Sequence, residues 1–380
     1  MHSHTRRGFL SRTLGASFLG ASLFEQAFFR ATLARAAAPA ARADAFDIEK
    51  VADGVYAAIA HAPVVINCNA AIFENEKDLL IVDTHSKPSA VAALVAQLRS
   101  VTPKPVRWVV ETHFHWDHSQ GAHAYRQLAP GAELVSSTTT RVLIADFGAA
   151  RLKASLEESA KALDGYRQQL GKATLPREKA HFEKMIAGTR AYIAEMQNYE
   201  PELPDVTFQD DFVLHDKAHQ LHLAFRGRGH TSGDVVVFCP QKKVLASGDL
   251  LHGWLPSMGD GYPHEWPYTL RRIGSFDFTK VIGGHGAVQD SRQRLEQFAG
   301  YIEELTDRVE AGKRNSQTLE QLQASITPAS LKSLSGEYGE FVGAQIVRDD
   351  ADAELSRPAD VVADSVKGNV EEVWNTLDKA

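Results

Sequence analysis

Short apolar runs, separated by polar, glycine or proline residues, recur along the chain from residue 55 onward. Such runs, bounded by turn residues, are typical of buried strands. They predict strands over residues 55–60, 70–74, 79–82, 107–111 and 133–136. After the third of these, Ser86 is expected to cap a helix that has Pro88 in its first turn and an apolar stripe from Ala90 to Leu98. A second short helix is predicted over residues 121–128.

The pattern changes in the middle of the chain and again at its end. Residues 141–200 are rich in Ala, Leu, Lys, Glu and Gln, with helical periodicity and a break at Gly171–Pro176, which predicts an inserted helical hairpin. Strands are predicted again over residues 206–215, 220–226, 235–238, 244–247 and 280–283, with a helix over 267–273. From Ser291 onward the pattern is almost wholly helical. Two strand-rich stretches bracketed by helices predict an α+β fold, with two sheets face to face and helices outside.

Charge is distributed unevenly over the 380 residues. The net charge is −7, but residues 1–43 carry six arginines and one acid, so the remainder carries −12. So acidic a chain lacks the basic surface that nucleic-acid binding requires, and no nucleic-acid partner is expected. Cys68 and Cys239 are the two cysteines. They allow one disulfide or two buried thiols, and the sequence does not choose between them.

The first 43 residues have the pattern of an export signal. Arg6 and Arg7 are followed by a hydrophobic pair, which resembles a twin-arginine signal, and a weakly apolar stretch extends over residues 14–29. Glu25 within that stretch argues against a stable membrane span. Small-residue sites end at Ala43, which predicts cleavage there and export through the twin-arginine translocase to the periplasm or the medium. The alternative interpretation is a disordered basic arm.

The strongest chemical signal is a cluster of metal-ligand side chains where the predicted strand 107–111 ends. His113, His115, Asp117 and His118 lie within six positions. Because alternate residues of an extended segment point the same way, His113 and His115 can chelate one ion, while Asp117 and His118 can face a second ion. Imidazole and carboxylate groups suit zinc.

This H-x-H-x-D-H segment resembles the signature of the metallo-β-lactamase superfamily. Further motifs of that family follow in order: the Gly-His-Thr motif with His230, the Ser-Gly-Asp motif with Asp249 and the Gly-His-Gly motif with His285; upstream, Asp83 ends a family-like strand. The resemblance covers roughly residues 50–290 and implies an αββα sandwich with a helical insertion and a helical C-terminal extension. The chain then divides into a signal peptide (1–43), a catalytic domain (44–290, insertion about 141–200) and the extension (291–380).

The resemblance also implies a ligand set for two zinc ions per chain. His113, His115 and His230 would bind the first ion. Asp117, His118 and His285 would bind the second, and Asp249 would bridge both. A water shared by two zinc ions is a hydroxide near neutral pH and would attack a carbonyl of a lactone, ester, thioester or β-lactam. Asp117 has a second role open to it, orienting that nucleophile, and Asp83 is expected to hold a site histidine rather than bind metal.

Substrate-binding residues are less well defined by the sequence. The candidates for walls of a small-molecule pocket are Trp116, Trp254, Tyr262, His264 and Trp266, with ordinary packing as the alternative for each aromatic residue. The helical insertion and the extension are candidates for shaping the cleft or a homodimer interface.

Two alternatives to a zinc hydrolase stay open. The first is an iron-dependent sulfur dioxygenase-like redox enzyme on the same fold, and the second is a non-catalytic metal-binding protein that would use the same ligands. Zinc β-lactamases of the family more often have Cys or Ser where this chain has Asp249, so the resemblance favours the lactonase, thioesterase and phosphodiesterase branches.

Overall fold

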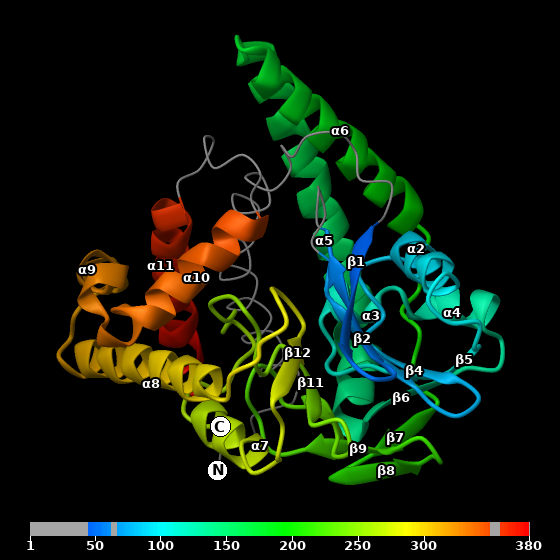
Figure 1. Ribbon diagram of the computed structural model, residues 1–380. Coiled ribbons are helices and arrows are strands. Elements are labelled where there is room, and N and C mark those ends of the chain that lie inside the picture. Colours follow the sequence, from blue (N-terminus) through cyan, green and yellow to red (C-terminus); the bar gives the residue numbers. More distant parts are fainter. Residues whose placement is uncertain (1–44, 62–66, 350–357, 380) are drawn as a thin grey trace, which may run out of the picture.

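The computed structural model describes residues 45–61, 67–349 and 358–379, and two sheets form its centre (Figure 1). The first sheet has seven strands in sequence order. Each of its first four strands pairs antiparallel with the next, and from β4 to β7 neighbouring strands pair parallel. The strands are β1 (Phe46–Ala52), β2 (Val55–Ala60), β3 (Ala70–Glu74), β4 (Leu79–Val82), β5 (Val106–Val110), β6 (Glu133–Ser137) and β7 (Val206–Phe208).

The second sheet has five strands in the order β12-β11-β10-β9-β8. Its strands are antiparallel except for the β11–β12 pair, which is parallel. The strands are β8 (Asp211–His215), β9 (Gln220–Phe225), β10 (Val235–Cys239), β11 (Val244–Gly248) and β12 (Lys280–Gly283). Because β11 and β12 are parallel, their carboxyl ends lie at the same edge of this sheet.

Three apolar layers hold the sandwich together. Between the sheets, Phe73 and Val82 of the first sheet meet Val237 and Ile282 of the second. Outside the first sheet lie α2 (Pro88–Leu98) and α4 (Ala122–Leu128), and outside the second lie α7 (Trp266–Ile273), α8 (Gln293–Arg314) and α11 (Pro358–Thr376). The prediction of an α+β sandwich with helices on both outer faces is confirmed.

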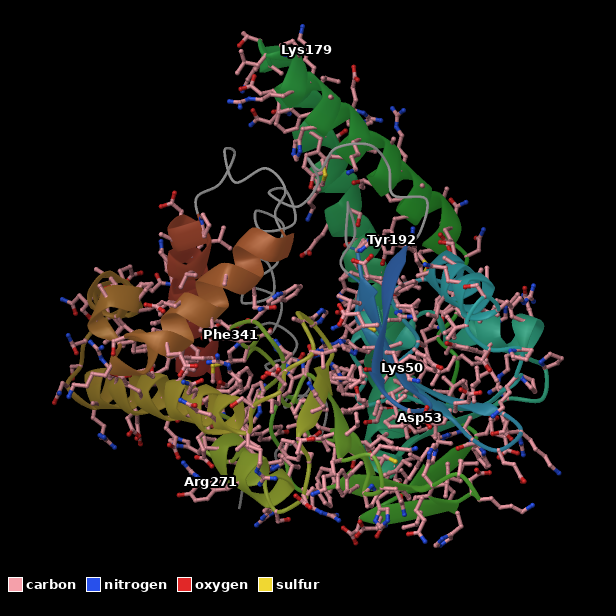
Figure 2. The ribbon with its side chains drawn as sticks, in the orientation of Figure 1. Lys50, Asp53, Lys179, Tyr192, Arg271 and Phe341 are labelled. Carbon is pink, nitrogen blue, oxygen red and sulfur yellow. The ribbon has the colours of Figure 1, made fainter. Side chains whose placement is uncertain are left out.

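A long helical hairpin leaves the first sheet between β6 and β7. It consists of α5 (Thr138–Lys172) and α6 (Pro176–Met196), with the break where the sequence predicts one. Figure 2 shows Lys179 at the far tip of this hairpin and Tyr192 near its base, beside the sandwich. The base is anchored by Leu152, Tyr192 and Met196, which form a small apolar cluster of their own.

The C-terminal extension is helical, as predicted. After α8 come α9 (Leu319–Ser325), two short 3-10 turns (Pro328–Ser330 and Lys332–Leu334) and α10 (Glu337–Asp349), before α11. Leu305, Val309, Val366 and Val370 of this region share one core with the five-stranded sheet. The extension therefore covers the outer face of that sheet and does not form a separate core.

Three local expectations need correction. Helix α2 begins at Pro88 after Lys87, and the Ser86 hydroxyl and amide bond the side chain of Asn67 instead of capping the helix. The strand predicted over residues 206–215 is two strands, β7 and β8, which belong to different sheets. The sequence pattern missed β1, an edge strand whose side chains are mostly half-buried or exposed.

The predicted export signal, residues 1–43, lies outside the described residues. Within the described ranges, no helix combines the length and the apolar character needed to cross a membrane. Cys68 and Cys239 are both buried free thiols, so the structure holds them unpaired with each other.

Candidate metal centre

The histidine and aspartate residues singled out in the sequence come together where strands of both sheets end. His113 and His115 follow β5, and α3 (Trp116–Ser119) carries Asp117 and His118. The other three come from the second sheet: His230 precedes β10, Asp249 follows β11 and His285 follows β12. Each of these residues lies in a loop or short helix close to the end of a buried strand, which brings them to the same edge of the two sheets.

One group of ligand atoms is made of three imidazoles. Suitable nitrogens of His113, His115 and His230 all lie within 4.8 Å of one another. The Nδ1 atom of His115 is 2.8 Å from Nε2 of His230. Three imidazoles that converge in this way, with His113 and His230 buried, form a candidate site for one metal ion.

A second group lies beside the first. Asp117, His118 and His285 also place ligand atoms within 4.8 Å of one another, with 3.2 Å between Oδ2 of Asp117 and Nε2 of His285. Asp249 lies between the groups: its Oδ2 is 3.6 Å from Nε2 of His230 and 3.4 Å from Nε2 of His285. The structure thus brings all seven sequence-predicted ligands into one cluster with a carboxylate at its centre.

The inner atoms of this cluster include polar atoms left without partners. Among the described residues, neither Nε2 of His113 nor Oδ1 of Asp249 has a hydrogen-bond partner, although both are buried. A buried polar atom without a partner is costly, and such atoms concentrate at sites that bind an ion or a ligand. The cluster therefore has the unsatisfied donor set that a metal ion would complete.

Electrostatics divides the imidazoles into two kinds. Burial holds the pKa of His113 well below its ordinary value and lowers that of His230 to about 3, so both are neutral and have a free lone pair. Burial would also lower the pKa of His118, but Asp249 and other nearby anionic groups raise it well above normal. Burial would raise the pKa of Asp249, but His285 and His118 hold it well below normal. The imidazoles of His118 and His285 and the buried carboxylates thus stabilise the charged forms of one another.

The outer ring nitrogens of the histidines are tied to the scaffold. His118 donates from Nδ1 to Asp83 at 2.8 Å, and Asp83 also accepts from the backbone amide and hydroxyl of Thr112. His230 donates from Nδ1 to the backbone carbonyl of Ser257 at 3.0 Å. These bonds set the tautomer of each ring and point its other nitrogen into the cluster. The position of Asp83 matches the role expected for it.

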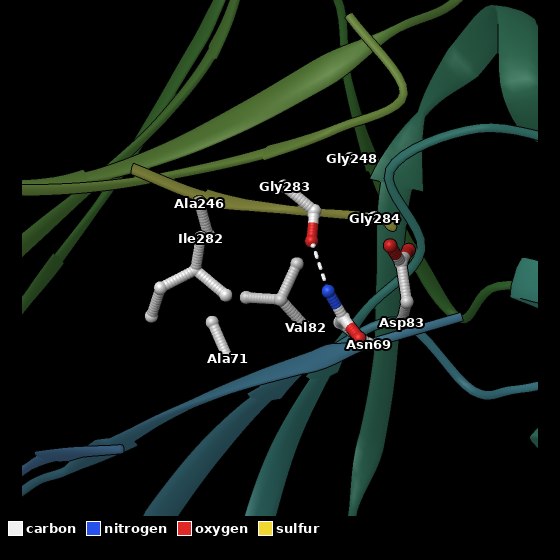
Figure 3. Close-up of a pocket in the computed structure, with 9 residues that line it drawn as sticks. All are labelled: Asn69, Ala71, Val82, Asp83, Ala246, Gly248, Ile282, Gly283 and Gly284. Carbon is white, nitrogen blue, oxygen red and sulfur yellow. Dashed lines mark hydrogen bonds between the residues drawn. The ribbon is translucent and has the colours of Figure 1, made fainter. Parts of the chain in front are cut away.

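Close backbone approach beneath the cluster requires glycine. Gly248 has a φ of +50°, and a Cβ on it would lie 2.4 Å from the hydroxyl of Thr112. Beside it lies a cavity of about 10 Å³ between the sheets, in which the Asn69 amide donates to the carbonyl of Gly283 (Figure 3). That volume is about the space one water molecule needs. The floor of the centre is thus packed tightly against both sheets.

The five candidate pocket residues have different surroundings. Trp254 stacks on the ring of His285, with centroids 4.7 Å apart. Trp266 is fully buried and donates from Nε1 to the carbonyl of Leu250, so it supports His230 from behind and does not line an open pocket as expected.

The remaining three have no ring contact to a candidate ligand among the contacts of the described residues. His264 is exposed. The Tyr262 ring lies under the guanidinium of Arg228, and Trp116 packs toward Tyr192 of the hairpin. Of the five, Trp254 is the one that combines partial exposure with ring contact to a candidate ligand.

Two further residues touch the centre, and sequence reasoning missed one of them, Asp260. Asp260 accepts a hydrogen bond from Nε2 of His115 at 2.9 Å. His252 is buried beside His285, with ring centroids 5.7 Å apart, and burial lowers its pKa to about 4. His252 follows Asp249 by three positions and is a candidate polar pocket residue from the sequence, whereas Asp260 lies 145 positions from its partner and has no such signal.

Cys68 lies directly behind the second group. Its thiol, the carboxylate of Asp83 and a ring nitrogen of His118 lie within 4.8 Å of one another. Burial raises the pKa of the Cys68 thiol to about 12, so it is a neutral thiol at physiological pH. It packs as a neutral thiol behind His118.

Comparison with known proteins identifies the family. The profile of the metallo-β-lactamase superfamily matches residues 63–285, which carry all seven candidate ligands. The chain belongs to this superfamily. Its αββα sandwich, with the helical hairpin and the helical extension, is the fold of that family with two additions.

Among curated members of the superfamily, two are similar over different lengths. The linear primary-alkylsulfatase of Pseudomonas sp. is 22% identical over 278 residues, which are 68% of this chain and 48% of that protein. The metallo-beta-lactamase type 2 of Bacillus cereus is 30% identical over 120 residues, 30% of this chain and 44% of that protein. The chain thus spans about half or less of the length of these relatives. A solved metallo-beta-lactamase from Pontibacter korlensis is 20% identical over 68% of this chain and 99% of its own, with a TM-score of 0.49.

Proposed function

We propose that the protein is a zinc-dependent hydrolase whose dinuclear centre acts on an ester-type or amide-type bond of a small molecule. The observation that carries the proposal is the position of Asp249. Its carboxylate lies between two separate groups of ligand atoms, 3.6 Å from His230 of the first and 3.4 Å from His285 of the second. A carboxylate shared by two sets of imidazoles suits a site for two metal ions. A site for a single ion would not require it.

The donor set fits zinc. Five imidazoles and two carboxylates are the nitrogen and oxygen ligands that this ion takes in catalytic sites. His113, His115 and His230 would hold one ion, and Asp117, His118 and His285 the other, with Asp249 between them. Nε2 of His113 and Oδ1 of Asp249, which are buried and make no hydrogen bond among the described residues, support this assignment.

Zinc bound there would supply Lewis acidity and a water whose pKa is lowered toward ~7. The chain's own residues would do the rest. Asp117, beside His285, has a second carboxylate oxygen with which to orient the attacking water and receive its proton. Asp83 keeps His118 in one tautomer, and Trp254, stacked on His285, shields one side of the centre from bulk water.

The substrate class is narrowed by similarity and not by a defined pocket. Lactones, esters, thioesters and β-lactams all present a carbonyl that such a centre would attack. A second candidate is a sulfate ester, because the alkylsulfatase is similar over 68% of this chain, whereas the Bacillus cereus β-lactamase is similar over 30%. The two candidates differ in the reacting atom, so a substrate panel separates them.

The test uses the full chain loaded with zinc. Hydrolysis of a chromogenic cephalosporin, a lactone, a thioester and a primary alkyl sulfate is measured, with and without a chelator. Asp117→Ala should lose turnover, while Asp164→Asn, on the exposed side of the hairpin, should keep it. Protein that carries two zinc ions and hydrolyses no member of the panel would count against the proposal. Purification with tightly bound iron and oxygen-dependent thiol oxidation would favour the dioxygenase. Unchanged hydrolysis in Asp117→Ala would refute the assignment of the reaction to this centre and leave it a metal-binding site without a catalytic role.

We also propose that residues 1–43 direct export through the twin-arginine route. The adjacent Arg6 and Arg7, the apolar stretch and the small residues before Ala43 support it. Cell fractionation of the full chain, beside a variant with both arginines changed to lysine, tests the idea. Cytoplasmic accumulation of the wild-type chain would refute it.

A further inference from the structure

The loop between Asp249 and α7 contacts the candidate metal ligands without supplying one of its own. Two of its residues bond outer ring nitrogens of the imidazole group. Asp260 accepts from Nε2 of His115 at 2.9 Å, and the carbonyl of Ser257 accepts from Nδ1 of His230 at 3.0 Å. Two residues within the four-residue stretch 257–260 therefore orient two of the three imidazoles in this group.

The bond to His115 determines which of its nitrogens can bind metal. With Nε2 engaged by Asp260, the free lone pair is on Nδ1, which faces Nε2 of His230 at 2.8 Å. A carboxylate on the outer nitrogen also makes the imidazole a stronger base toward a metal. His118 is held in the same way by Asp83, which directly follows β4, whereas Asp260 lies on a longer loop.

Asp260 is in turn held by the helical insertion. Its other oxygen accepts from the guanidinium of Arg151 at 2.8 Å, and Arg151 is on α5. The same guanidinium lies 4.5 Å from the centre of the Phe114 ring. Phe114 is buried, and in the chain it stands between His113 and His115. Arg151 therefore has two fixed contacts, one to the loop and one to the ligand segment, and it joins the insertion to both.

Helix α11 and the residues after it hold the loop through the backbone of the loop. Glu372 of α11 accepts from the amide of Met258 at 2.8 Å, and Lys379 donates to the carbonyl of Gly259 at 3.0 Å. Glu372 is buried, so its contact to the loop is shielded from solvent. The loop thus lies between the two additions to the family sandwich, and its position depends on both.

We propose that Asp260 is a positioning residue for His115, with Arg151 acting through it, so that the helical insertion sets the affinity of the imidazole group for its metal ion. The inference rests on the proposed function, because it presumes that this group binds metal. It gives the insertion a role in the centre that its sequence did not suggest.

The test measures metal affinity directly. The full-length protein is stripped of metal, and the dissociation constants of the first and second zinc ions are determined by competition with a chromophoric chelator. Asp260→Ala should weaken one of the two ions 10- to 100-fold and leave the other unchanged. Asp260→Asn keeps one acceptor at the same place and should recover part of the loss, and Arg151→Gln should fall between Asn and wild type.

Matched controls come from the same helix. Arg167 and Asp164 form an exposed ion pair on α5 at 2.7 Å, so Arg167→Gln and Asp164→Asn repeat the charge changes away from the centre. Both should bind zinc as the wild type does. Replacing zinc by cobalt gives a spectroscopic readout: the visible bands should change in the Asp260 variants and stay unchanged in the controls, a difference that a general loss of stability would not produce.

The outcomes separate this inference from the proposed function. Wild-type protein that binds no zinc would refute both. Wild-type protein that binds two ions, with Asp260→Ala and Asp260→Asn equal to it in affinity and cobalt spectrum, would refute the inference alone. Equal loss in Asp260 variants and in the Arg167 and Asp164 controls would also refute it, because the effect would then arise from the surface charge of the hairpin.

Discussion

Gly284 is the position at which one methyl group should disable the metal centre and leave the fold intact. A Cβ built on Gly284 would lie 2.1 Å from Oδ1 of Asp249 and 2.7 Å from Cε1 of His118. Its backbone is fixed from two sides, since its amide donates to the carbonyl of Gly248 and its carbonyl accepts from the amide of Asn69. The carboxylate of Asp249 and the ring of His118 are therefore the groups that must move in Gly284→Ala, and the carboxylate must move farther.

The size of that movement follows from the distances. Ordinary contact begins near 3.4 Å, so the carboxylate oxygen must move by about 1.3 Å from its place 2.1 Å from the new carbon. Metal–ligand distances tolerate about 0.2 Å, so a shift of that size removes Asp249 as a ligand. We expect zinc affinity to fall at least 10- to 100-fold, the range seen when even an outer support of a ligand is lost. Overpacking should cost about 1–3 kcal/mol of folding free energy.

The assay pairs metal affinity with stability of the metal-free protein. Zinc binding is measured by chelator competition, and the unfolding free energy of the stripped protein by urea titration. Gly300→Ala is the matched control, because a Cβ at that position in α8 would meet no described atom within 4 Å beyond its chain neighbours and its own helix backbone. Wild-type zinc affinity in Gly284→Ala would refute the reasoning, since it would mean that Asp249 does not bind metal from the position described.

Stability measurements test the fold and the centre separately. Burial raises the pKa of Glu372 from 4.5 to about 8. Between these pH values the folded chain keeps a proton that the unfolded chain releases, so the unfolding free energy should fall as pH rises. Glu372→Gln should flatten this slope in urea titrations across the same pH range. Leu94→Ala, on the buried face of α2, should cost about 2–5 kcal/mol by the same titration, and a cost below 1 kcal/mol would contradict the packing described. A chelator should lower the melting temperature, and zinc at a thousand times its Kd should add about 4 kcal/mol; identical melting curves with and without chelator would count against a bound ion.

Much of the sandwich could be predicted because its strands are buried on one or both faces. The runs at β2, β3 and β4 match the structure residue for residue, since each is a block of apolar side chains between turns. The exceptions have physical reasons. β1 is an edge strand with few buried side chains, so its pattern is weak. The chain passes from β7 in one sheet to β8 in the other within two residues, with no glycine or proline to mark the change.

The candidate site also has a part that the sequence predicts and a part that it does not. The ligand histidines and aspartates occur in short motifs, and each motif follows a predictable strand, so the sequence could place them together. The support of His115 by Asp260 depends on a loop 145 residues away, and no local pattern encodes such a contact. The burial of Trp266 was equally hidden, because an aromatic residue near a site is compatible with either a pocket wall or the core.

The hairpin leaves from β6 and returns to β7, its neighbour in the same sheet. Its two ends therefore stay close whatever its length, and doubling such an excursion costs only about 0.6 kcal/mol in closure entropy. Arg151, its link to the centre, lies on α5 at the level of the anchoring cluster of Leu152 and Tyr192, while Lys179 lies at the distant tip. The outer turns can thus be shortened, lengthened or exchanged in evolution or by engineering, while the turns near the base stay under selection for the chemistry.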